Sequence, residues 1–455
     1  MTKIIEPARE IPVINEVDVV VVGGGCTGTF AAIRAARLGA RVALIEASNA
    51  FGGVATNGFV CIWHTLCDMT FNKQIIGGLT EEVIERMKKV PHGIKITLPA
   101  EDQKHIFRPV TYTNYRFNTE ELKIELDAMV TESGVIPYLH TTYSAPYVRD
   151  GALCGVIVET RSGRGAILAK QFIDATADGF LGGDMGMEVY RHETLQPATT
   201  AARVVGWKKL TNPNDILNRN RERIGCKPGW DACFADVPEV WNWFKSNISV
   251  DCSDAETLTR AEITGRAQLR RMMDILREED PNAKDLALVG LSSTIGIREA
   301  RQLRCSYQVT TDDICYGRKF EDAIAYCAYP MDIHHQHAQT SYRFLDGTEE
   351  IYEPGKPKRV GKFREISDDM PTYWQLPYRS MLPRDIPNLL ICGRAIDADK
   401  GALAAARVMI SLNQTGEAAG VAAFEALTSG TTVQGIDFKA MRRKMKQGGS
   451  IVLEN

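Results

Sequence analysis

The hydrophobic pattern near the N-terminus changes its period twice. Residues 19–22 are four consecutive valines, a run typical of a parallel strand buried on both faces. A stretch with helical spacing follows and ends near Gly39, and the next apolar run, RVALIE, ends at Glu46. This order predicts a strand, a crossover helix and a second parallel strand, which is the βαβ unit of an α/β sheet.

Further elements are predicted later in the chain. Residues 163–178, GRGAILAKQFIDATAD, predict a short strand, a turn and an apolar strand that ends in small residues. Residues 388–399, NLLICGRAIDAD, predict a strand and a loop, before an alanine-rich helix that starts near Gly401. Between these regions, residues 254–280 have helical spacing and residues 340–354 have the alternation of strands.

Three glycines separate the first strand from the first helix. Gly23 permits a tight turn, Gly25 lets backbone N–H groups approach a pyrophosphate, and Gly28 with Ala32 lets the helix pack closely on the strand. The helix N-terminus carries a partial positive charge that favours an anion. Glu46 ends the second strand, where an acid meets ribose hydroxyls. The segment therefore predicts a dinucleotide site.

The glycine motif alone leaves NAD and FAD open. Gly52 and Gly53 follow soon after the acid. Because a pyrophosphate that extends toward a flavin needs further small residues beyond the second strand, this pair favours FAD. No second motif of the same kind is evident, so we expect no NADPH-binding domain and an electron acceptor of unknown identity.

Segments that match a known family span most of the chain. They are IIEPAREIPVINEVDVVVVGGG, LIEASNAFGGVATNG, IIGGLTEEVIERM, FIDATADGFLGG, GIREARQL, YPMDIH, LPYRSMLP and NLLICGRAIDADKGALAAARVMISLNQTGEAAGVAAFEAL. Together they resemble the FAD-dependent oxidoreductase family of the glutathione-reductase-like flavoprotein superfamily. Cys26 stands where this family more often has proline, a change that the glycine turn should tolerate.

The resemblance implies a set of FAD-binding residues drawn from both ends of the chain. The glycine motif would cradle the pyrophosphate, Glu46 would hold the adenosine ribose, and residues 174–178 would return the chain to the nucleotide. The full set is Gly23, Gly25, Cys26, Thr27, Gly28, Glu46, Ala47, Gly52, Gly53, Thr56, Ala175, Thr176, Asp178, Gly393, Arg394, Asp397 and Ala402.

The junction after Gly393 has a specific role in similar flavoproteins. It closes over the ribityl chain, and the following helix points its N-terminus at the pyrimidine edge of the flavin, where the helix dipole stabilises the negative charge of the reduced ring. Many members have a neutral residue where this chain has Asp397. An acid there would oppose the dipole unless it bonds the ribityl hydroxyls.

The predicted fold is α/β with a discontinuous nucleotide-binding domain. Residues 1–184 and 385–455 are expected to form a Rossmann-like FAD-binding domain with a central parallel sheet and a smaller antiparallel sheet. Residues 185–384 are expected to form an inserted mixed α+β cap that covers the reactive face of the flavin. Substrate would then bind in the crevice between the two parts.

Candidate catalytic residues gather in the segment YPMDIHHQH. Asp332 and His334 alternate on one face if the segment is extended, so Asp332 can orient the His334 imidazole and raise its basicity. His335 is a second candidate. Together with His337, the two histidines also suggest zinc, but no further residues complete a ligand set, so we expect no metal. Surface or packing roles for these histidines stay open.

Two arginines and a third histidine extend this list. The resemblance places Arg298 and Arg379 at the side of the cap that faces the flavin, where they can clamp a carboxylate or a polarised carbonyl. Structural ion pairs with Glu299 or Asp385 are the alternative. His64 lies in the loop after the second glycine pair, and such loops run toward the flavin ring.

Cys61 and Cys67 raise the alternative of a disulfide reductase. In the wider superfamily the redox-active cysteine pair lies nearer the glycines and is more closely spaced. Here five residues intervene, and on a helix that spacing puts the two sulfurs on different faces. We therefore expect no redox-active pair.

Composition narrows the partners and the compartment. The 455 residues carry a net charge of -3 with no long run of either sign, so nucleic acid is not an expected partner. The longest apolar run, residues 402–427, contains Arg407, Asn413, Gln414 and Glu417, so a membrane is not an expected partner either. The first eighteen residues contain charges and prolines where a secretory signal needs an apolar stretch. Eleven cysteines without paired spacing favour reduced thiols and a cytoplasmic location.

These observations predict an FAD-dependent oxidoreductase that transfers a hydride between a small organic substrate and flavin N5. Two alternatives stay open: a flavin-containing binding or sensing protein without turnover, and a disulfide reductase that uses Cys61 and Cys67. The substrate, the direction of the reaction, the electron acceptor, covalent attachment of the flavin and the oligomeric state are not determined by the sequence.

Overall fold

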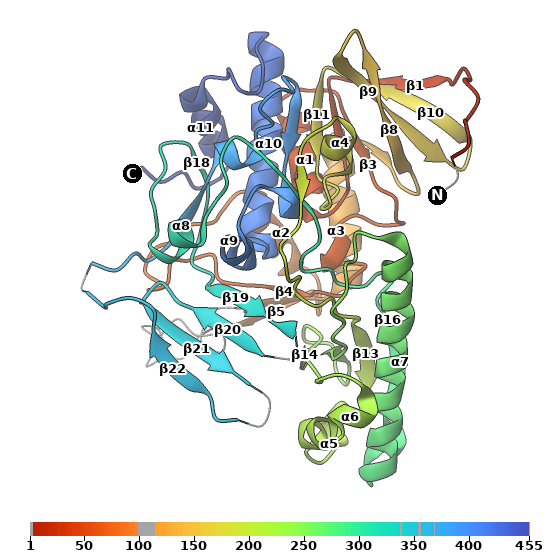
Figure 1. Cartoon of the computed structure of the whole chain (residues 1–455), viewed down its shortest axis with the longest axis vertical. Helices are drawn as coiled ribbons and strands as arrows, with labels where there is room; N and C mark the ends of the chain where they lie inside the picture. Colours follow the sequence, from red (N-terminus) through yellow and green to blue (C-terminus); the bar gives the residue numbers. More distant parts are fainter. Residues whose placement is uncertain (1–2, 99–113, 337–338, 354–355, 368, 455) are drawn as a thin grey trace.

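A five-stranded parallel sheet lies at the centre of the upper part of the molecule (Figure 1). The structure is a computed structural model that describes residues 3–98, 114–336, 339–353, 356–367 and 369–454. In the order in which they pair, the strands are β24 (Leu389–Ile391), β11 (Gln171–Asp174), β2 (Val19–Val22), β3 (Val42–Ile45) and β7 (Ile136–Tyr138).

The two faces of β2 contact different layers. Val19 and Val21 face a helical layer, and Val20 and Val22 belong to the apolar cluster under a second sheet. The helical layer contains α1 (Cys26–Arg37), α2 (Leu79–Met87), α3 (Thr119–Glu132), α10 (Met409–Ser429) and α11 (Phe438–Gln447). The second sheet, in order of pairing, is β1 (Val13–Glu16), β10 (Gly163–Leu168), β9 (Ala152–Thr160) and β8 (Thr142–Arg149). Burial on both faces explains the unbroken valine run.

α10 lies directly against α1, although almost four hundred residues separate the two helices in the sequence (Figure 1). A Cβ atom at Gly416 would overlap the carbonyl oxygen of Thr27, and one at Gly420 would overlap that of Ala31. A buried ion pair between Arg34 and Glu417 also joins the helices. Glycine at the crossing therefore lets the two backbones approach closely.

The alanine-rich helix that we expected from Gly401 is two helices. α9 (Lys400–Ala406) ends at Arg407, and α10 begins at Met409. Val408 between them has an extended backbone, with φ of -67° and ψ of 142°, so the chain changes direction there. The break gives the C-terminal region a second helix N-terminus.

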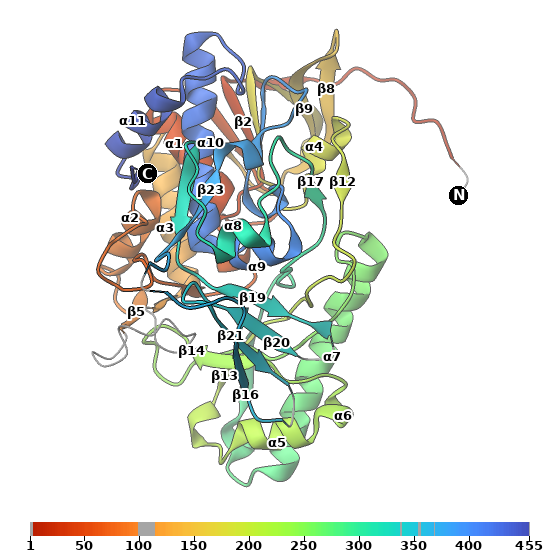
Figure 2. The same cartoon turned by 60° about the vertical axis from the view of Figure 1, so that its left-hand side comes forward.

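Two antiparallel sheets from the region that we expected to form the cap lie below the parallel sheet in Figures 1 and 2. One antiparallel sheet contains β14 (Trp230–Cys233), β15 (Trp241–Phe244), β13 (Ala202–Val205) and β16 (Ala287–Leu291). The neighbouring helices are α5 (Pro213–Arg219), α6 (Arg221–Ile224) and α7 (Ala255–Glu279). A second antiparallel sheet contains β19 (Met331–His334), β20 (Thr340–Arg343), β21 (Thr348–Tyr352) and β22 (Arg359–Lys362).

Shorter elements connect these parts. They are β4 (Ile62–Trp63), β5 (Ile94–Thr97), β6 (Asn114–Phe117), β12 (Val189–Tyr190), β17 (Gln302–Leu303), β18 (Ala323–Cys327), β23 (Trp374–Pro377), α4 (Phe180–Asp184) and α8 (Thr311–Cys315). The expected α/β architecture, a parallel sheet with antiparallel sheets beside it, is confirmed. Within the described ranges, every helix is too short or too polar to cross a membrane.

Candidate functional site

The glycine turn after β2 leaves an open space in front of α1. Gly23 has φ of 102°, and a Cβ atom there would overlap the backbone of Ala175. A Cβ atom at Gly28 would overlap the carbonyl oxygen of Gly23, whereas one at Gly25 would meet no atom within 4 Å. α1 begins at Cys26 without a side-chain cap. The N–H groups of its first turn therefore have no intrahelical acceptor and point out of the helix end.

The second glycine pair lies beside this open space. Gly52 bridges to Gly25, and its N–H donates to the carbonyl oxygen of Gly24 at 2.8 Å. A Cβ atom at Gly53 would come within 3.1 Å of the Cα of Gly25. The Thr56 hydroxyl donates to a carbonyl oxygen of the same turn at 2.6 Å, so it supports the turn from behind.

Glu46 holds the glycine turn and the following loop together. One carboxylate oxygen accepts from the Gly24 N–H at 2.7 Å. The other accepts from the N–H and the hydroxyl of Ser48, at 2.8 and 2.6 Å. Ala47, next to it, is exposed. These bonds fix the carboxylate at the end of β3, beside the glycine turn.

The ends of β11 and β24 complete this edge of the sheet. Beyond the Ala175 backbone, the Thr176 hydroxyl donates to the buried carboxylate of Asp174 at 2.7 Å. The Gly393 N–H donates to the hydroxyl of Thr415 on α10 at 3.3 Å, and a Cβ atom at Gly393 would lie 3.7 Å from the side chain of Thr27. Segments from both ends of the chain thus meet at the start of α1.

Arg394 connects the end of the parallel sheet to the cap. Its guanidinium pairs with Asp178 at 2.6 Å, donates to the carbonyl oxygen of Ala177 at 3.3 Å and also donates to that of Ile297 in the cap. Arg394 and Asp178 were both expected beside the cofactor. Their charged groups bind each other here, because the guanidinium is largely buried and needs a carboxylate partner.

Asp397 and Ala402 also have protein partners. Asp397 is fully buried, and its carboxylate accepts from the Tyr190 hydroxyl at 2.8 Å, from the Cys305 N–H at 2.8 Å and from Arg304 at 3.2 Å. These three donors all come from residues 185–384, so within the described residues the charge of Asp397 is compensated by protein groups. The Ala402 N–H donates to the carboxylate of Asp399, the N-cap of α9.

α10, by contrast, starts without a side-chain cap. Its N-cap residue is Val408, which offers no acceptor to the first turn. Gly416, which crosses α1 at Thr27, lies seven residues after Met409, so the start of α10 is about 10 Å from the crossing at about 1.5 Å per residue. Two helix ends without a side-chain cap among the described residues therefore lie about 10 Å apart. A helix does start near Gly401, as expected, but Asp399 caps it, so the uncapped helix end in this region is that of α10.

A buried polar cluster forms where α9 meets α10. Arg407 donates to the backbone oxygen and the carboxylate of Asp332, at 3.1 and 3.4 Å. The same carboxylate accepts from the Tyr329 hydroxyl at 3.0 Å and pairs with Nε2 of His334 at 3.3 Å. The His64 ring stacks on Tyr329 with centroids 4.5 Å apart. Three of the residues singled out from the sequence, His64, Asp332 and His334, thus come together.

The electrostatics of this cluster differ from the expectation in one respect. Burial lowers the pKa of His334, and the neighbouring carboxylate of Asp332 only partly offsets this effect. Burial raises the pKa of Asp332, but the charges of His334, Arg407 and Arg298 outweigh it and hold that pKa well below its usual range. Burial lowers the pKa of His64 to about 4. Asp332 thus raises the pKa of His334 as expected, but burial outweighs this effect, and both imidazoles are neutral at pH 7.

Arg298 belongs to the same cluster. One terminal nitrogen donates to the carbonyl oxygen of Pro197 and to the hydroxyl of Thr199, both at 2.7 Å. Burial, followed by the charge of Arg407, lowers the pKa of Arg298 to about 10, and the Asp332 carboxylate acts in the opposite direction. The guanidinium still carries its charge at pH 7 and lies within electrostatic reach of both groups.

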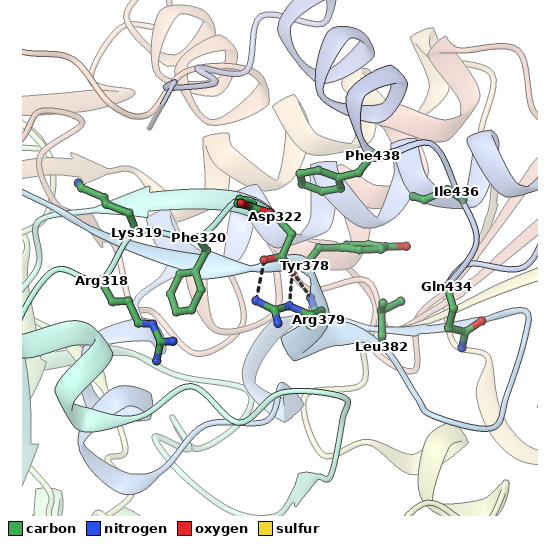
Figure 3. Close-up of a pocket in the computed structure, with 11 residues that line it drawn as sticks. Arg318, Lys319, Phe320, Asp322, Tyr378, Arg379, Leu382, Gln434, Ile436 and Phe438 are labelled. Atoms are coloured by element: carbon green, nitrogen blue, oxygen red, sulfur yellow. Dashed lines mark hydrogen bonds and ion pairs between the residues drawn. The ribbon is translucent and has the colours of Figure 1, made fainter.

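Arg379 and His335 lie apart from the cluster. Arg379 pairs with Asp322 at 2.9 Å on the rim of a cavity of about 400 Å³, shown in Figure 3, and half of its side chain is exposed. Arg379 therefore makes the kind of structural ion pair that was the alternative, with Asp322 in place of Glu299 or Asp385. His335 bonds the Ser341 hydroxyl at 2.8 Å within its own hairpin. His337 lies outside the described residues.

The cysteines give no support to a redox pair. All eleven lie within the described residues and are free thiols. Burial raises the pKa of Cys61 to about 11, and its sulfur accepts from Asn242 at 2.9 Å. Burial also raises the pKa of Cys67, and that of Cys26 to about 12. Such thiols are poor nucleophiles at neutral pH. Across the described ranges, no cluster of three or more His, Cys, Asp or Glu side chains is placed to hold a metal ion.

Two residues of the cluster, Arg407 and Gln196, were not among the expected site residues. The Oε1 atom of Gln196 accepts from the His334 N–H at 3.1 Å and from Arg407 at 3.4 Å. The sequence contains a sign that Arg407 is functional, since a charged residue inside the apolar run from 402 to 427 is unusual. Gln196 had none, because its position in the cluster results from the packing of the cap.

Comparisons with known proteins also indicate a protein that binds FAD. A family model described as "FAD dependent oxidoreductase" matches residues 18–445. A dihydrolipoyl dehydrogenase from Trypanosoma brucei brucei is 51% identical over 49 residues, which is 11% of this chain and 10% of that protein. The chain therefore matches only about a tenth of the length of that curated relative.

Similar solved structures are distant in sequence. A geranylgeranyl bacteriochlorophyll reductase-like protein from Thermoplasma acidophilum is 14% identical, with 95% of this chain and 83% of that one covered and a TM-score of 0.47. The p-nitrophenol 4-monooxygenase PnpA from Pseudomonas putida DLL-E4 is 11% identical, with 95% and 85% covered and a TM-score of 0.45.

Proposed function

This chain belongs to the FAD-dependent oxidoreductase family, and from that premise we propose that it transfers a hydride between a small organic substrate and N5 of FAD. FAD is its cofactor and supplies the hydride acceptor or donor when bound. We also propose that the family lies within the glutathione-reductase-like superfamily. The order of β2, glycine turn, α1, β3 and Glu46 supports this placement.

One observation carries the proposal: two open helix ends and a buried acid–base cluster follow one another along the same edge of the molecule. The start of α1 lies beside the strand ends and crosses α10 at Thr27 and Gly416. The start of α10 lies about 10 Å further on, and Arg407 connects it to the cluster. A dinucleotide with a redox-active ring at one end fits such an arrangement.

The residues at each end suit the parts of FAD that would lie there. The open space at Gly25 and the N–H groups of Cys26, Thr27 and Gly28 would hold the pyrophosphate. Glu46, at the end of β3, would face the adenosine ribose. The start of α10 at Met409 would face the pyrimidine edge of the flavin.

His334 is the residue that we propose to move the proton. Its imidazole is neutral at pH 7, because burial lowers its pKa, so it can accept a proton from a substrate hydroxyl or amine. The ion pair with Asp332 fixes the ring and stabilises the imidazolium once it forms. In the reverse direction the imidazolium returns the proton.

The setting of the enzyme is part of the proposal. Eleven unbridged cysteines favour a reducing compartment, and we propose the cytoplasm. The partners would be a small-molecule substrate and a separate electron acceptor, with neither nucleic acid nor a membrane involved.

The proposal is tested on purified protein reconstituted with FAD. We expect a bound yellow flavin that a substrate bleaches and an acceptor reoxidises. His334→Gln should lower kcat by about 10²- to 10⁴-fold, the usual contribution of a general base, with FAD content unchanged. Since the base must be neutral, the rate should fall only below pH 6.5. His92→Gln, at an exposed loop histidine, is the matched control.

Two outcomes contradict the proposal at different points. A protein that stays colourless after incubation with FAD would contradict the cofactor site. A flavin that His334→Gln leaves fully active would contradict the assigned proton transfer and leave the FAD site in place.

A further inference from the structure

The polar cluster beside the start of α10 carries more positive than negative charge. Two guanidinium groups, Arg298 and Arg407, lie within reach of one carboxylate, that of Asp332. The other carboxylate at the border of the cluster, that of Glu299, accepts from the Gln196 N–H at 3.1 Å and pairs with His192. His334 and His64 add no charge at pH 7, because burial lowers the pKa of both. Since an uncompensated charge is costly in a buried site, the cluster favours the entry of one anion.

Hydrogen-bond donors in the cluster point to the same ligand chemistry. Gln196 is 2% exposed, and its Oε1 is engaged by His334 and Arg407. These two donors fix the orientation of the amide, so Nε2 is the remaining donor, and it has no acceptor among the described residues. The Nε of Arg407 is likewise buried without an acceptor in the described part of the chain. Buried donors without acceptors are rare in native proteins, so they indicate an acceptor that a ligand brings.

Arg298 is held so that part of its fork stays available. Its hydrogen bonds to described residues, to the Pro197 carbonyl oxygen and the Thr199 hydroxyl, both come from one terminal nitrogen. These bonds anchor the group to the cap segment before β13. A guanidinium has five N–H donors in a planar fork, which suits two oxygens of a carboxylate. The anchoring reduces the loss of side-chain freedom when such a ligand binds.

We propose that the substrate carries a carboxylate and that Arg298, with Arg407 and Gln196, binds it beside the proton-transferring His334. This inference rests on the proposed function, because it concerns the substrate of that reaction. Arg298 belongs to the cap and Arg407 to the α9–α10 junction, so a bound carboxylate would bridge the two parts of the molecule. The arginines thereby determine specificity for an anionic substrate.

The test uses the FAD-loaded protein and three pairs of probes. Acetate, succinate and benzoate are compared with acetamide, succinamide and benzamide, at constant ionic strength, by titration of the visible difference spectrum of the flavin. We expect the carboxylates to give saturable spectral changes and the amides none. Arg298→Gln should raise the Kd of the carboxylates by about 10- to 100-fold, the usual effect of losing a charged hydrogen-bond partner.

Matched variants separate binding from folding. Arg379→Gln removes an arginine paired at the surface and should leave Kd unchanged. Arg298→Lys keeps the charge but not the planar fork, so Kd should rise about tenfold. If Arg298→Gln releases FAD, only Arg298→Lys tests the carboxylate site. An unchanged Kd of the carboxylates in Arg298→Lys then overturns the proposal.

Three further results also overturn the carboxylate site. The first is equal binding of amides and carboxylates, and the second is the absence of any saturable response to the three acids. The third is an Arg298→Gln variant that retains FAD and binds the carboxylates with an unchanged Kd, even if its flavin midpoint potential shifts. Photoreduction of the flavin and its reoxidation by a dye are measured in parallel. A flavin that cycles normally while ignoring carboxylates would overturn this inference and leave the proposed oxidoreductase intact.

Discussion

The glycines of the first turn differ in what they do. Gly23 and Gly28 have neighbouring backbone atoms where a Cβ atom would stand, so they are needed for the turn to form at all. Gly25 has open space instead and an ordinary φ of -60°, so the folded protein alone does not require glycine there. We propose that the bound pyrophosphate is what requires glycine at this position.

Gly25→Ala should therefore separate folding from FAD binding. We expect an unchanged melting temperature of the FAD-free protein, because the added methyl group meets no atom within 4 Å. The Kd for FAD should rise by about tenfold or more, since the methyl group keeps the pyrophosphate from the first-turn N–H groups. Calorimetry and FAD fluorescence titration measure the two quantities. Gly361→Ala, also in open space but on β22, is the control. Equal FAD affinity in both variants would contradict the assigned cradle.

At the scale of elements, the break between α9 and α10 places the cluster. If one continuous helix ran from Lys400, Arg407 would lie inside it and no free N-terminus would exist at Met409. The break leaves the start of α10 open, and Arg407 reaches the strand that carries Asp332 and His334. Helix propensity alone does not reveal this, because alanine and leucine favour helix on both sides of the break.

The crossing of α1 and α10 depends on Gly416. Gly416→Ala should lower the free energy of unfolding by about 3 kcal/mol, the upper range for overpacking, because the added methyl group overlaps the backbone oxygen of Thr27 and cannot rotate away. FAD affinity should fall as well, since the start of α1 moves with the crossing. Urea unfolding measures the first effect. Thr428→Ala, on the exposed end of α10, should change stability by less than about 0.5 kcal/mol. Similar stability losses in both variants would argue against the close crossing.

At the scale of the whole molecule, the cap is joined to the parallel sheet by buried charged groups. Asp397 receives hydrogen bonds from Tyr190, Arg304 and the Cys305 backbone, all between residues 185 and 384. Arg394 reaches Ile297 in the same region. Both anchors lie just after β24. The position of the cap over the cluster is therefore set beside the strand that we expect to meet the flavin.

Asp397→Asn should loosen the cap. The change removes the negative charge that pairs with Arg304, and it places an amide donor where the neighbouring groups are donors that need an acceptor. We expect the free energy of unfolding to fall by about 3 kcal/mol. We expect a lower melting temperature and faster limited proteolysis between residues 185 and 384, with FAD still bound. Asp385→Asn, at an exposed residue, is the control. A proteolysis pattern equal to that of the control would contradict this role.

Much of the nucleotide half was predictable from local pattern. The valine run, the glycine turn and the acid at Glu46 are contiguous, so their geometry follows from short-range rules. The site on the cap side was predictable only in part. His64, Asp332 and His334 were identified from residue type and local sequence, and Arg298 from the family resemblance, whereas no local pattern indicates that Arg379 pairs with Asp322. The domain boundaries at residues 184 and 385 stay a prediction, although every strand of the parallel sheet lies outside residues 185–384.

The sequence by itself determined the α/β class, the turn that presents backbone donors in front of α1, and the residue types available for proton transfer. Those features depend on neighbours within one turn or one strand. Only the tertiary structure decided that α10 rather than α9 has the open end, that Asp397 and Arg394 bind the cap, and that Arg407 and Gln196 join the cluster. These outcomes depend on packing between segments hundreds of residues apart, and on which buried charge finds which partner, and no local pattern encodes either.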